Sequence, residues 1–477
     1  MEKPQISNGN TAEAPTIFVI FGATGDLAEK KLFPALFDLH RKKLLPKKCH
    51  IVASARRPFS DDEFRKLVAS FLSTGKSFSE EELTSFFKII SYHQGFFDEP
   101  DTYGRLAVQL QKIDDSFGQC SNKLFYLAVP PSFYETILKH LAASELTKPC
   151  GGELGWTPLE KSRHRRLPTP VDVGSLTGWT RILVEKPFGN DMETARVLDR
   201  LLGSLFKEEQ IFRIDHYLAK ESLENFLKLR FSNGAFGAVW NHEHISRVEV
   251  QFFQKGDVKG RGNFYDPIGA LRDVGQNHLL EMAALAAMDE PKGKGAAAMR
   301  KARGEVLKKF IFASRDLTEV SSRAQYEGYS DEEGVAKNSQ TETYFRLVLA
   351  LPTPRWQGVP FVLEAGKALP ESRVEIVVHF KHKVHGVCPP GAECLSLNRI
   401  VFRVESLPTN SKEGSQPLDA YEKVLLHAVG GDQTLFTSTE EVMEEWRIVM
   451  PVLNLWHKMD SPASLYKYQK GTMPKIA

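Results

Sequence analysis

The sequence predicts an α/β, Rossmann-like dinucleotide-binding domain followed by an α+β domain built on a large antiparallel sheet. Three observations predict this fold class. Strand-like and helix-like segments alternate up to about residue 210, which is typical of a parallel sheet covered on both faces. A glycine loop follows the first strand-like segment. Beyond residue 210, several segments alternate apolar and polar residues, as strands with one solvated face do.

The first half of the chain contains short apolar runs and longer amphipathic segments in turn. Short runs that end at Gly, Pro or charged residues favour strands, and the amphipathic segments favour helices. The expected strands lie at residues 16–21, 50–56, 123–131 and 181–189, and the expected helices at 27–45, 61–72, 132–144 and 191–206.

The second half has a different texture, with longer alternating runs and two helical segments. The expected strands lie at 238–254, 341–352, 373–380 and 398–406, and the helices at 267–288 and 418–429. The resulting division is a disordered lead-in at 1–15, a dinucleotide-binding domain at 16–210 with an insertion at about 158–180, and a substrate and dimerisation domain at 211–477.

The insertion is basic and contains proline, and two copies of Gly-Trp-Thr flank it. We expect a surface segment in a helix-to-strand connection. A translated intron is the alternative, since the chain reads through smoothly without the segment. Its run "KSRHRR" would suit nucleic acid, but no aromatic residues interleave the charges.

The composition is that of a soluble globular protein. The chain has 477 residues, 42% of them hydrophobic and 26% charged, with a net charge of +2. The balanced charge argues against nucleic acid as a partner, and no apolar run is long enough to span a membrane. The polar N-terminal segment is not a secretory signal. Five scattered cysteines without zinc-finger spacing predict a reducing, cytoplasmic setting and no metal site.

The glycine loop "FGATGDLAEKK" predicts a nucleotide site. Gly22 and Gly25 let the backbone turn tightly and approach a pyrophosphate at a helix N-terminus. An NAD site usually has an acidic residue after the second strand, but this chain has Arg56 and Arg57 there, with Lys31 on the first helix. Cations at this place suit a 2′-phosphate, so we expect NADP as the cofactor.

The stretch "RIDHYLAKE" gathers six charged or ionisable side chains in nine residues. Oxidation of an alcohol by hydride transfer needs a base, and a histidine oriented by a carboxylate suits that task. "RIDHYLAKE" supplies Asp215 and His216, and "LRDVGQNHLLE" supplies Asp273 and His278. Spacing alone does not say which histidine is the base.

The same stretch also offers the groups that hold a phosphate. His216, Tyr217 and Lys220 provide two nitrogen donors and a hydroxyl within about one turn of chain. Lys220 lies near the start of an expected helix, whose dipole would help to hold an anion.

The ordered motifs of the chain resemble those of the glucose-6-phosphate dehydrogenase family over roughly residues 16–451. "RIDHYLAKE" is the most specific of them and differs from the usual pattern mainly at Ala219, where glycine is common. The others are "GATGDLAEKKLFPALFDL", "FYLAVPPSFYE", "RILVEKPFG", "RGNFYDPIGALRDVGQNHLLEMAALAAM", "SQTETYF", "WQGVPFVLEAGKAL", "DAYEKVLLHAVGGDQTLF" and "WRIVMPVL".

The resemblance implies a role for each matching residue. His278 matches the family's base and Asp215 its carboxylate partner, while Lys186 and Lys220 complete the catalytic set. The remaining matches bind ligands. The substrate set is Lys186, His216, Tyr217, Lys220, Gln254, Asp273, Lys367 and Arg373, and the cofactor set is Gly22, Thr24, Gly25, Asp26, Leu27, Lys31, Arg56, Tyr134 and Lys186.

The chain departs from the family pattern at several places. Gln254 stands where the family generally has a glutamate that binds sugar hydroxyls, and Glu405 stands where glutamine is usual in some members. We expect a weaker hold on glucose 6-phosphate; an exchange of acid and amide between these two positions is a second hypothesis. Arg373 takes the place of a basic substrate-binding residue in shifted register. The short segment 407–417 puts the second, structural NADP site of some members in doubt.

The implied reaction is oxidation of β-D-glucose 6-phosphate at C1 to 6-phosphogluconolactone, with hydride transfer to NADP⁺. This is the first step of the oxidative pentose phosphate pathway, and the resemblance also implies a homodimer or homotetramer. Two alternatives stay open: a non-catalytic protein that binds NADP or a sugar phosphate, and a dehydrogenase with another sugar-phosphate or NAD preference.

Overall fold

The computed structural model describes residues 14–72, 78–148, 178–232, 234–381, 398–404, 418–458 and 464–476. The chain forms two compact units. The first comprises the chain up to Phe188, Val197–Ile214 and Leu418–Leu435, and the second comprises Gly189–Arg196, Asp215–Pro417 and Phe436–Ala477. The first unit therefore extends a few residues past 210, and Leu418–Leu435, which we assigned to the second domain, returns to it. The expected lead-in and most of the insertion lie outside the described residues.

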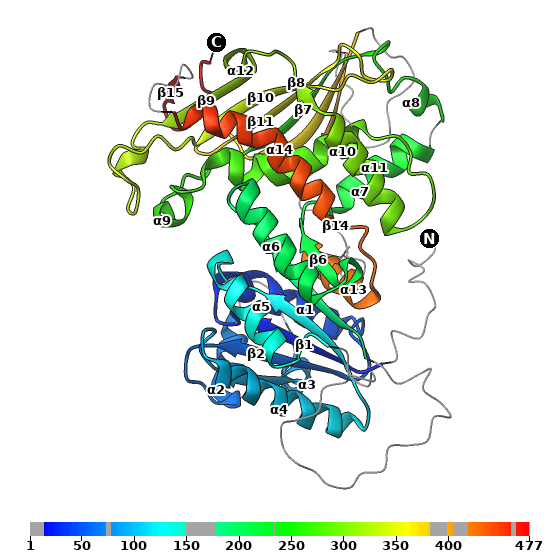
Figure 1. The fold of residues 1–477 in the computed structure, drawn as a ribbon, viewed down its shortest axis with the longest axis vertical. Coiled ribbons are helices and arrows are strands. Elements are labelled where there is room, and N and C mark those ends of the chain that lie inside the picture. Colours follow the sequence, from blue (N-terminus) through cyan, green and yellow to red (C-terminus); the bar gives the residue numbers. More distant parts are fainter. Residues whose placement is uncertain are drawn as a thin grey trace. The chain divides into compact units, whose positions relative to one another are not determined.

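The first unit contains a parallel sheet in the order β6-β5-β4-β1-β2-β3. Its strands β1 and β2 are labelled in Figure 1, where they lie side by side. Each neighbouring pair is parallel. The strand order changes direction between β1 and β4, and in such sheets ligands bind at the carboxyl ends beside that point. The strands are β1 Thr16–Phe21, β2 Cys49–Ala55, β3 Ile90–Gln94, β4 Asn122–Leu127, β5 Thr180–Glu185 and β6 Ile211–Ile214.

Helices pack on this sheet in two groups. Aromatic pairs join α1 to α2 and to α3, with ring centroids 5.6 Å apart for Phe33 and Phe64 and 5.2 Å apart for Phe37 and Phe86. The ring of Tyr103 in α4 contacts His140 in α5. The helices are η2 Ala28–Leu32, α1 Phe33–Arg41, α2 Asp61–Leu72, α3 Glu80–Phe87, α4 Pro100–Phe117, η3 Pro131–Phe133, α5 Tyr134–Ala143, α6 Met192–Leu205, η4 Glu208–Gln210 and α13 Ala420–Gly430.

The second unit is built on a large sheet in the order β13-β12-β7-β11-β10-β9-β15, with β8 paired to β10. We expected an antiparallel sheet, but it is mixed: β7 runs parallel to β11, and β15 runs parallel to β9. Its strands are β7 Ile245–Phe253, β8 Ile311–Phe312, β9 Ser321–Tyr326, β10 Tyr344–Ala350, β11 Pro360–Gly366, β12 Arg373–Phe380, β13 Arg399–Arg403 and β15 Leu465–Tyr468. The short strand β14, Phe436–Thr437, is not a strand of this sheet.

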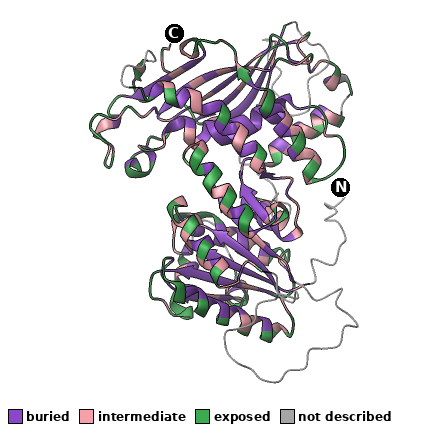
Figure 2. Cartoon of the chain, viewed as in Figure 1, coloured by how far each residue is buried: buried purple, intermediate pink, exposed green. Residues whose placement is uncertain are grey.

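One long helical segment, η5 followed by α10, packs against β7 and β11. Every residue of α10 is buried, because α11 and α14 cover the side of this segment that faces away from the sheet (Figure 2). The helices are α7 Glu221–Ser232, α8 Gly234–Ala238, α9 Gly262–Tyr265, η5 Leu271–Leu279, α10 Leu280–Ala287, α11 Ala296–Lys309, α12 Leu317–Val320, η6 Tyr329–Asp331 and α14 Thr439–Trp456. Within the described ranges, none of the helices combines the length and the apolar character that a membrane crossing requires.

Candidate active site

A buried histidine–carboxylate pair forms the centre of the candidate site, in the second unit. Nδ1 of His278 lies 2.6 Å from Oδ1 of Asp215, and both side chains are 2% exposed. Because a carboxylate at this distance accepts the Nδ1 proton, it holds the imidazole in the tautomer whose Nε2 is basic. The pair is the one that the resemblance implied.

Asp215 stays ionised although it is buried. Burial alone would raise its pKa, but the imidazoles of His278 and His216 and a backbone hydrogen bond stabilise the charged form, and the pKa falls to about 2. The bond comes from the N–H of Tyr217 at 2.9 Å. The second oxygen, Oδ2, is buried without a hydrogen-bond partner among the described residues. A carboxylate that is charged at neutral pH can stabilise the imidazolium that forms when His278 takes a proton.

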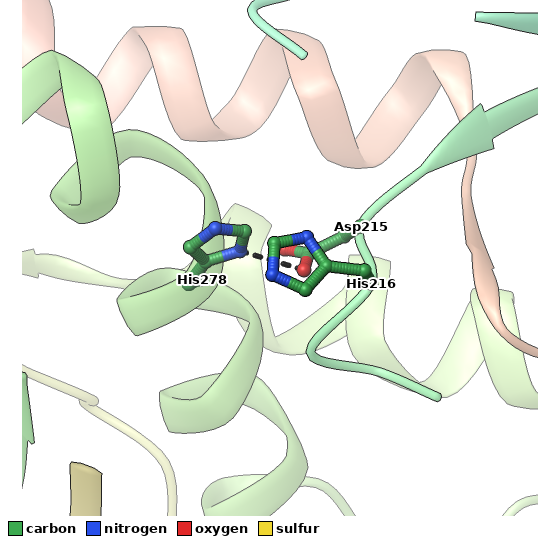
Figure 3. Close-up of side chains that lie close together, drawn as sticks. All are labelled: Asp215, His216 and His278. Atoms are coloured by element: carbon green, nitrogen blue, oxygen red, sulfur yellow. Dashed lines mark hydrogen bonds and ion pairs between the residues drawn. The ribbon is translucent and has the colours of Figure 1, made fainter. Parts of the chain in front are cut away.

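Aromatic rings enclose His278. Its ring centroid lies 4.4 Å from that of Tyr217, 5.1 Å from that of His216 and 6.1 Å from that of Phe252. Figure 3 shows His216 and His278 approaching the Asp215 carboxylate from two different segments. Ligand atoms of these three groups all lie within 4.8 Å of one another, an arrangement that would also attract a metal ion. The expectation of no metal site stays a prediction.

The stretch "RIDHYLAKE" reaches the site through two consecutive turns. Backbone carbonyls of Asp215 and Tyr217 close the turns, and α7 begins only at Glu221. The turns bury Asp215 and leave His216 and Lys220 partly exposed. Nζ of Lys220 lies 5.6 Å from the ring centroid of Tyr217. The three residues expected to grip a phosphate therefore lie together, just before a helix N-terminus.

His278 belongs to η5, which has π-helical hydrogen bonding. The side chain of Asn277 accepts the N–H of His278 at 2.7 Å and donates to the carbonyls of Arg272 and Asp273 at 3.2 Å. These bonds occupy backbone groups that the wider turn frees. Segments of this type are rare and frequently occur at functional sites, because the extra residue re-aims the side chains.

A second polar group surrounds Lys367. Its Nζ donates to Oε1 of Gln254 at 2.7 Å and lies 3.4 Å from Oδ2 of Asp273. The ring centroid of Tyr265 lies 4.9 Å from the same nitrogen. The three residues expected to bind sugar hydroxyls are thus neighbours, although they follow β7, belong to η5 and follow β11. Together they offer an ammonium, an amide and a carboxylate, which are suitable partners for hydroxyl groups.

In the first unit, the glycine loop joins β1 to its helix as expected. Gly22 has a φ of 86°, and a Cβ at this position would lie 2.2 Å from the carbonyl oxygen of Ala128. The N–H of Gly25 donates to the carbonyl of Gly22 at 3.0 Å, which closes the turn. Only glycine fits at position 22. Thr24 lies in the turn, and Asp26 and Leu27 begin the helix that follows it.

The basic residues expected to select NADP lie beside this loop. Phe21 at the end of β1 pairs in register with Ser54 in β2, so Arg56 follows the neighbouring strand at the same edge of the sheet. Arg56 and Arg57 are exposed, and so is Lys31. Exposed cations next to a phosphate-binding turn can accommodate a 2′-phosphate.

Lys186 follows β5 at the same carboxyl edge and is partly exposed. Tyr134, by contrast, is 1% exposed, and its hydroxyl donates to the carbonyl of Glu185 at 2.9 Å. The described contact makes Tyr134 a support for the residue before Lys186. The hydroxyl of Tyr126 donates to the Glu185 side chain at 2.6 Å and supports the same point from β4.

Arg373 begins β12 and pairs in register with Phe253, the residue before Gln254. Its guanidinium lies 4.7 Å from the Phe253 ring centroid, and its ion pairs go to Glu371 at 2.5 Å and Glu375 at 3.8 Å. Arg373 therefore lies near the group around Lys367 without a described bond to it. Glu405 and the segment 407–417 lie outside the described residues.

Sequence reasoning missed two tyrosines that contact Lys367. Tyr265 lies in the quoted segment "RGNFYDPIGALRD", and its buried ring faces Lys367. Tyr468 lies near the C-terminus, and its hydroxyl donates to the carbonyl of Lys367 at 2.7 Å. An aromatic residue inside a family motif was a usable signal for Tyr265. Nothing local marks Tyr468, because its role depends on the pairing of β15 with β9.

Comparisons with known proteins show the family of the chain. Residues 19–225 match the model "Glucose-6-phosphate dehydrogenase, NAD binding domain", and residues 227–411 and 405–476 match the model of its C-terminal domain. A glucose-6-phosphate 1-dehydrogenase from Chlamydia muridarum is 34% identical over 93% of this chain and 91% of its own length. A relative from Arabidopsis thaliana, "Glucose-6-phosphate 1-dehydrogenase 6, cytoplasmic", is 34% identical over 94% of this chain and 87% of its own length.

A solved structure titled "Glucose-6-phosphate dehydrogenase in complex with its substrate glucose-6-phosphate" matches with a TM-score of 0.80 and 30% identity. It covers 96% of this chain and 95% of that one. Both domain models, in order, span nearly the whole sequence, and the fold agrees with the same family. The chain belongs to the glucose-6-phosphate dehydrogenase family of oxidoreductases.

Proposed function

We propose that the protein oxidises β-D-glucose 6-phosphate at C1 with NADP⁺ and that His278 is the base. Family membership supports the reaction, and the observation that supports the base is the 2.6 Å bond between Nδ1 of His278 and Asp215. Nε2 of His278 takes the proton of the C1 hydroxyl as hydride leaves C1, and the buried charge of Asp215 stabilises the imidazolium.

The sugar phosphate is positioned by two sets of side chains. His216, Tyr217 and Lys220 hold the phosphate, and Lys367 with Asp273 binds ring hydroxyls. Binding energy gained at the phosphate, away from C1, orients C1 toward His278 and so contributes to the rate of the chemical step.

The cofactor site of the first unit fits NADP. The turn at Gly22 leaves no room for a side chain, and exposed cations flank it at Lys31, Arg56 and Arg57. When bound there, NADP⁺ supplies the hydride acceptor. Arg56→Ala should raise the KM for NADP⁺ about tenfold or more and change the KM for NAD⁺ little, because only NADP⁺ carries the 2′-phosphate.

The direct test follows reduction of NADP⁺ by absorbance in the presence of glucose 6-phosphate. His278→Asn should lower kcat by about 10²–10⁴-fold and leave NADP⁺ affinity unchanged. His244→Asn is the matched control, because His244 bonds to Asn241 away from the pair. Turnover by the His278 variant at the wild-type rate would exclude His278 as the base. Absence of turnover in the wild type, with NADP⁺ bound, would favour a non-catalytic binding protein.

A cytoplasmic location and a homodimer or homotetramer belong to the same proposal. Support comes from the family and from the relative that is named cytoplasmic. Sedimentation of the purified chain at micromolar concentration tests the assembly, and a purely monomeric protein would contradict it.

A further inference from the structure

A buried cluster of charged side chains lies behind the helical segment that carries His278. It contains one arginine, Arg303 of α11, and three glutamates: Glu281 of α10 and Glu441 and Glu445 of α14. Each of the four residues is at most 1% exposed. Burying a charge is costly unless a partner compensates it, so every carboxylate here needs a donor or a proton.

Within the cluster, Arg303 forms a hydrogen bond with Glu441. Nε of Arg303 donates its single hydrogen to Oε1 of Glu441 at 2.6 Å. The backbone N–H of Ser438 donates to the other oxygen of Glu441 at 2.6 Å, so both of its oxygens have donors. Glu281 lies 3.1 Å from the same Nε, yet neither of its oxygens has a hydrogen-bond donor among the described residues.

Glu445 also has an oxygen without a hydrogen-bond donor among the described residues. Its Oε2 accepts from the side chain of Gln276 at 3.1 Å, whereas its Oε1 is buried without a donor among the described residues. The side chains of Glu281 and Glu445 interact with each other. Two carboxylates cannot form a hydrogen bond, since neither carries a hydrogen. A single proton between them would supply the missing donor.

The surrounding charges favour such a proton. Burial, then the charge of Glu441, raises the pKa of Glu281 to about 8, Asp215 adds to this, and Arg303 opposes it. Burial, Glu281, Asp215 and Glu441 raise the pKa of Glu445 well above its ordinary value. A fully ionised cluster would hold three negative charges against one guanidinium, beside the charge of Asp215.

We propose that Glu281 and Glu445 share one proton and that this pair is a positioning element for His278. Gln276, which bonds to Glu445, precedes His278 by two residues, and Glu281 follows it by three. The pair therefore fixes the helical segment on both sides of the base. Because it holds one proton, the pair carries a net charge of −1, behind Asp215. The proton sharing stands independently, whereas the effect on His278 rests on the proposed function.

Unfolding at different pH values tests the shared proton without any assay of activity. The folded protein would keep this proton up to about pH 8, whereas an unfolded glutamate loses it near pH 4.5. Stability from the pair is thus fully present below pH 4.5 and is lost as the pH rises toward 8. Between pH 5.5 and 7.5, the unfolding constant of the wild type should rise about tenfold per pH unit relative to Glu281→Gln or to the double variant Glu281→Gln/Glu445→Gln.

Infrared spectroscopy gives a second readout of the same proton. The spectrum of the wild type minus that of Glu281→Gln at neutral pH should contain the C=O band of a protonated carboxyl group. Glu441→Gln is the control from the same cluster, because its carboxylate already has two donors. That variant should be less stable, and its unfolding constant should still rise with pH relative to Glu281→Gln, but only up to a lower pH, because the charge of Glu441 contributes to the raised pKa of Glu281. Parallel unfolding curves for wild type and Glu281→Gln, without the infrared band, would overturn the shared proton.

The pH profile of kcat/KM tests the effect on His278. In either single glutamine variant, the remaining glutamate keeps one negative charge on the pair. The acid limb of the profile should therefore stay within a few tenths of a pH unit of its wild-type position. The double variant removes that charge and should move the limb to lower pH. If each single change moves the limb about half as far as the double change, both carboxylates are ionised in the wild type and the proposal is wrong.

Discussion

Asp215 combines burial with a negative charge at neutral pH, and the role that we propose for His278 depends on this combination. The Asp215 carboxylate is anchored at Oδ1 by His278 and by the N–H of Tyr217, so its position does not depend on solvent. Desolvation would normally favour the protonated acid, but the two imidazoles outweigh it. The protein therefore holds an oriented imidazole beside a charged carboxylate at neutral pH.

Replacement of Asp215 by asparagine should separate the effect of its charge from that of its shape. The variant Asp215→Asn preserves the side-chain volume but removes the charge that stabilises the imidazolium. We expect kcat to fall by about 10²–10⁴-fold, the KM for glucose 6-phosphate to change less than about threefold, and the acid limb of kcat/KM to move to lower pH. Steady-state kinetics from pH 5 to 9 measure all three. An unchanged kcat would show that His278 does not need its carboxylate.

Gln254 sets the charge around Lys367. The amide oxygen of Gln254 accepts a hydrogen bond from the Lys367 ammonium at 2.7 Å but carries no charge. Asp273, at 3.4 Å, is therefore the carboxylate nearest to that nitrogen among the described contacts. Gln254→Glu adds a charged acceptor for a sugar hydroxyl, and charged acceptors form stronger bonds. We expect the KM for glucose 6-phosphate to fall about three- to tenfold, with kcat within twofold. Gln254→Ala is the control and should raise the KM. A higher KM in the glutamate variant would contradict this account.

At the scale of elements, the C-terminal strand β15 supports the loop that carries Lys367. Besides the bond from Tyr468 to the Lys367 carbonyl, the N–H of Gly471 donates to the carbonyl of Ala368 at 2.7 Å. Ala368 has a φ of 52°, a conformation that a residue with a side chain rarely adopts without support. A strand distant in sequence thus fixes the backbone from which the Lys367 ammonium extends.

Tyr468→Phe removes one hydroxyl and leaves the ring in the core. We expect a loss of about 1 kcal/mol in the free energy of unfolding, because the Lys367 carbonyl loses a buried donor. The KM for glucose 6-phosphate should rise severalfold with a smaller change in kcat. Tyr466→Phe on the same strand is the matched control, because Tyr466 is 37% exposed. Equal effects of both changes would show that the strand has no specific role at Lys367.

The elements show why part of the fold was readable from the sequence. The helix at 61–72 and the strands at 16–21 and 373–380 have the predicted limits, since their apolar patterns are uninterrupted. Strand β3, "ISYHQ", was missed because polar residues dominate it. Its His93 is nevertheless buried, because Gln109 and a backbone carbonyl satisfy its ring nitrogens. The parallel pairing of β7 with β11 was also missed, because side-chain alternation carries no information on strand direction.

The sequence predicted which site residues lie together only where those residues share one segment. "RIDHYLAKE" contains in one stretch the three residues expected to hold a phosphate, but the Asp215–His278 pair spans 63 positions and the Gln254–Lys367 pair spans 113. Without the family resemblance, no pattern joined these residues. The pairing of Glu281 with Glu445 was equally hidden, because each alone reads as an ordinary helical glutamate.

For the molecule as a whole, the two units should respond to acid in opposite directions. Burial lowers the pKa of three described histidines of the first unit, His40, His50 and His93, and that of His50 falls to about 4. Because an unfolded histidine binds its proton near pH 6.5, stability of this unit is lost as the pH falls from 6.5 toward 4. In the second unit, the raised pKa of Glu281 has the opposite sign, and stability increases as the pH falls toward 4.5.

Calorimetry can separate these two responses. We expect two unfolding transitions, and the one that NADP⁺ raises belongs to the first unit. Between pH 7.5 and 5 this transition should move to lower temperature, with His50 contributing about 2–3 kcal/mol over the full window from 6.5 to 4. The temperature of the other transition should stay constant or rise, since acid-linked loss of stability from Asp215 begins only below pH 4.

The control variant is His50→Gln, which keeps a polar partner for Ser91, 2.9 Å from Nε2 of His50. It should reduce the pH dependence of the first unit's transition temperature and leave that of the second unit unchanged. An NADP⁺-sensitive transition that is independent of pH, or one common transition for both units, would contradict this division of the stability.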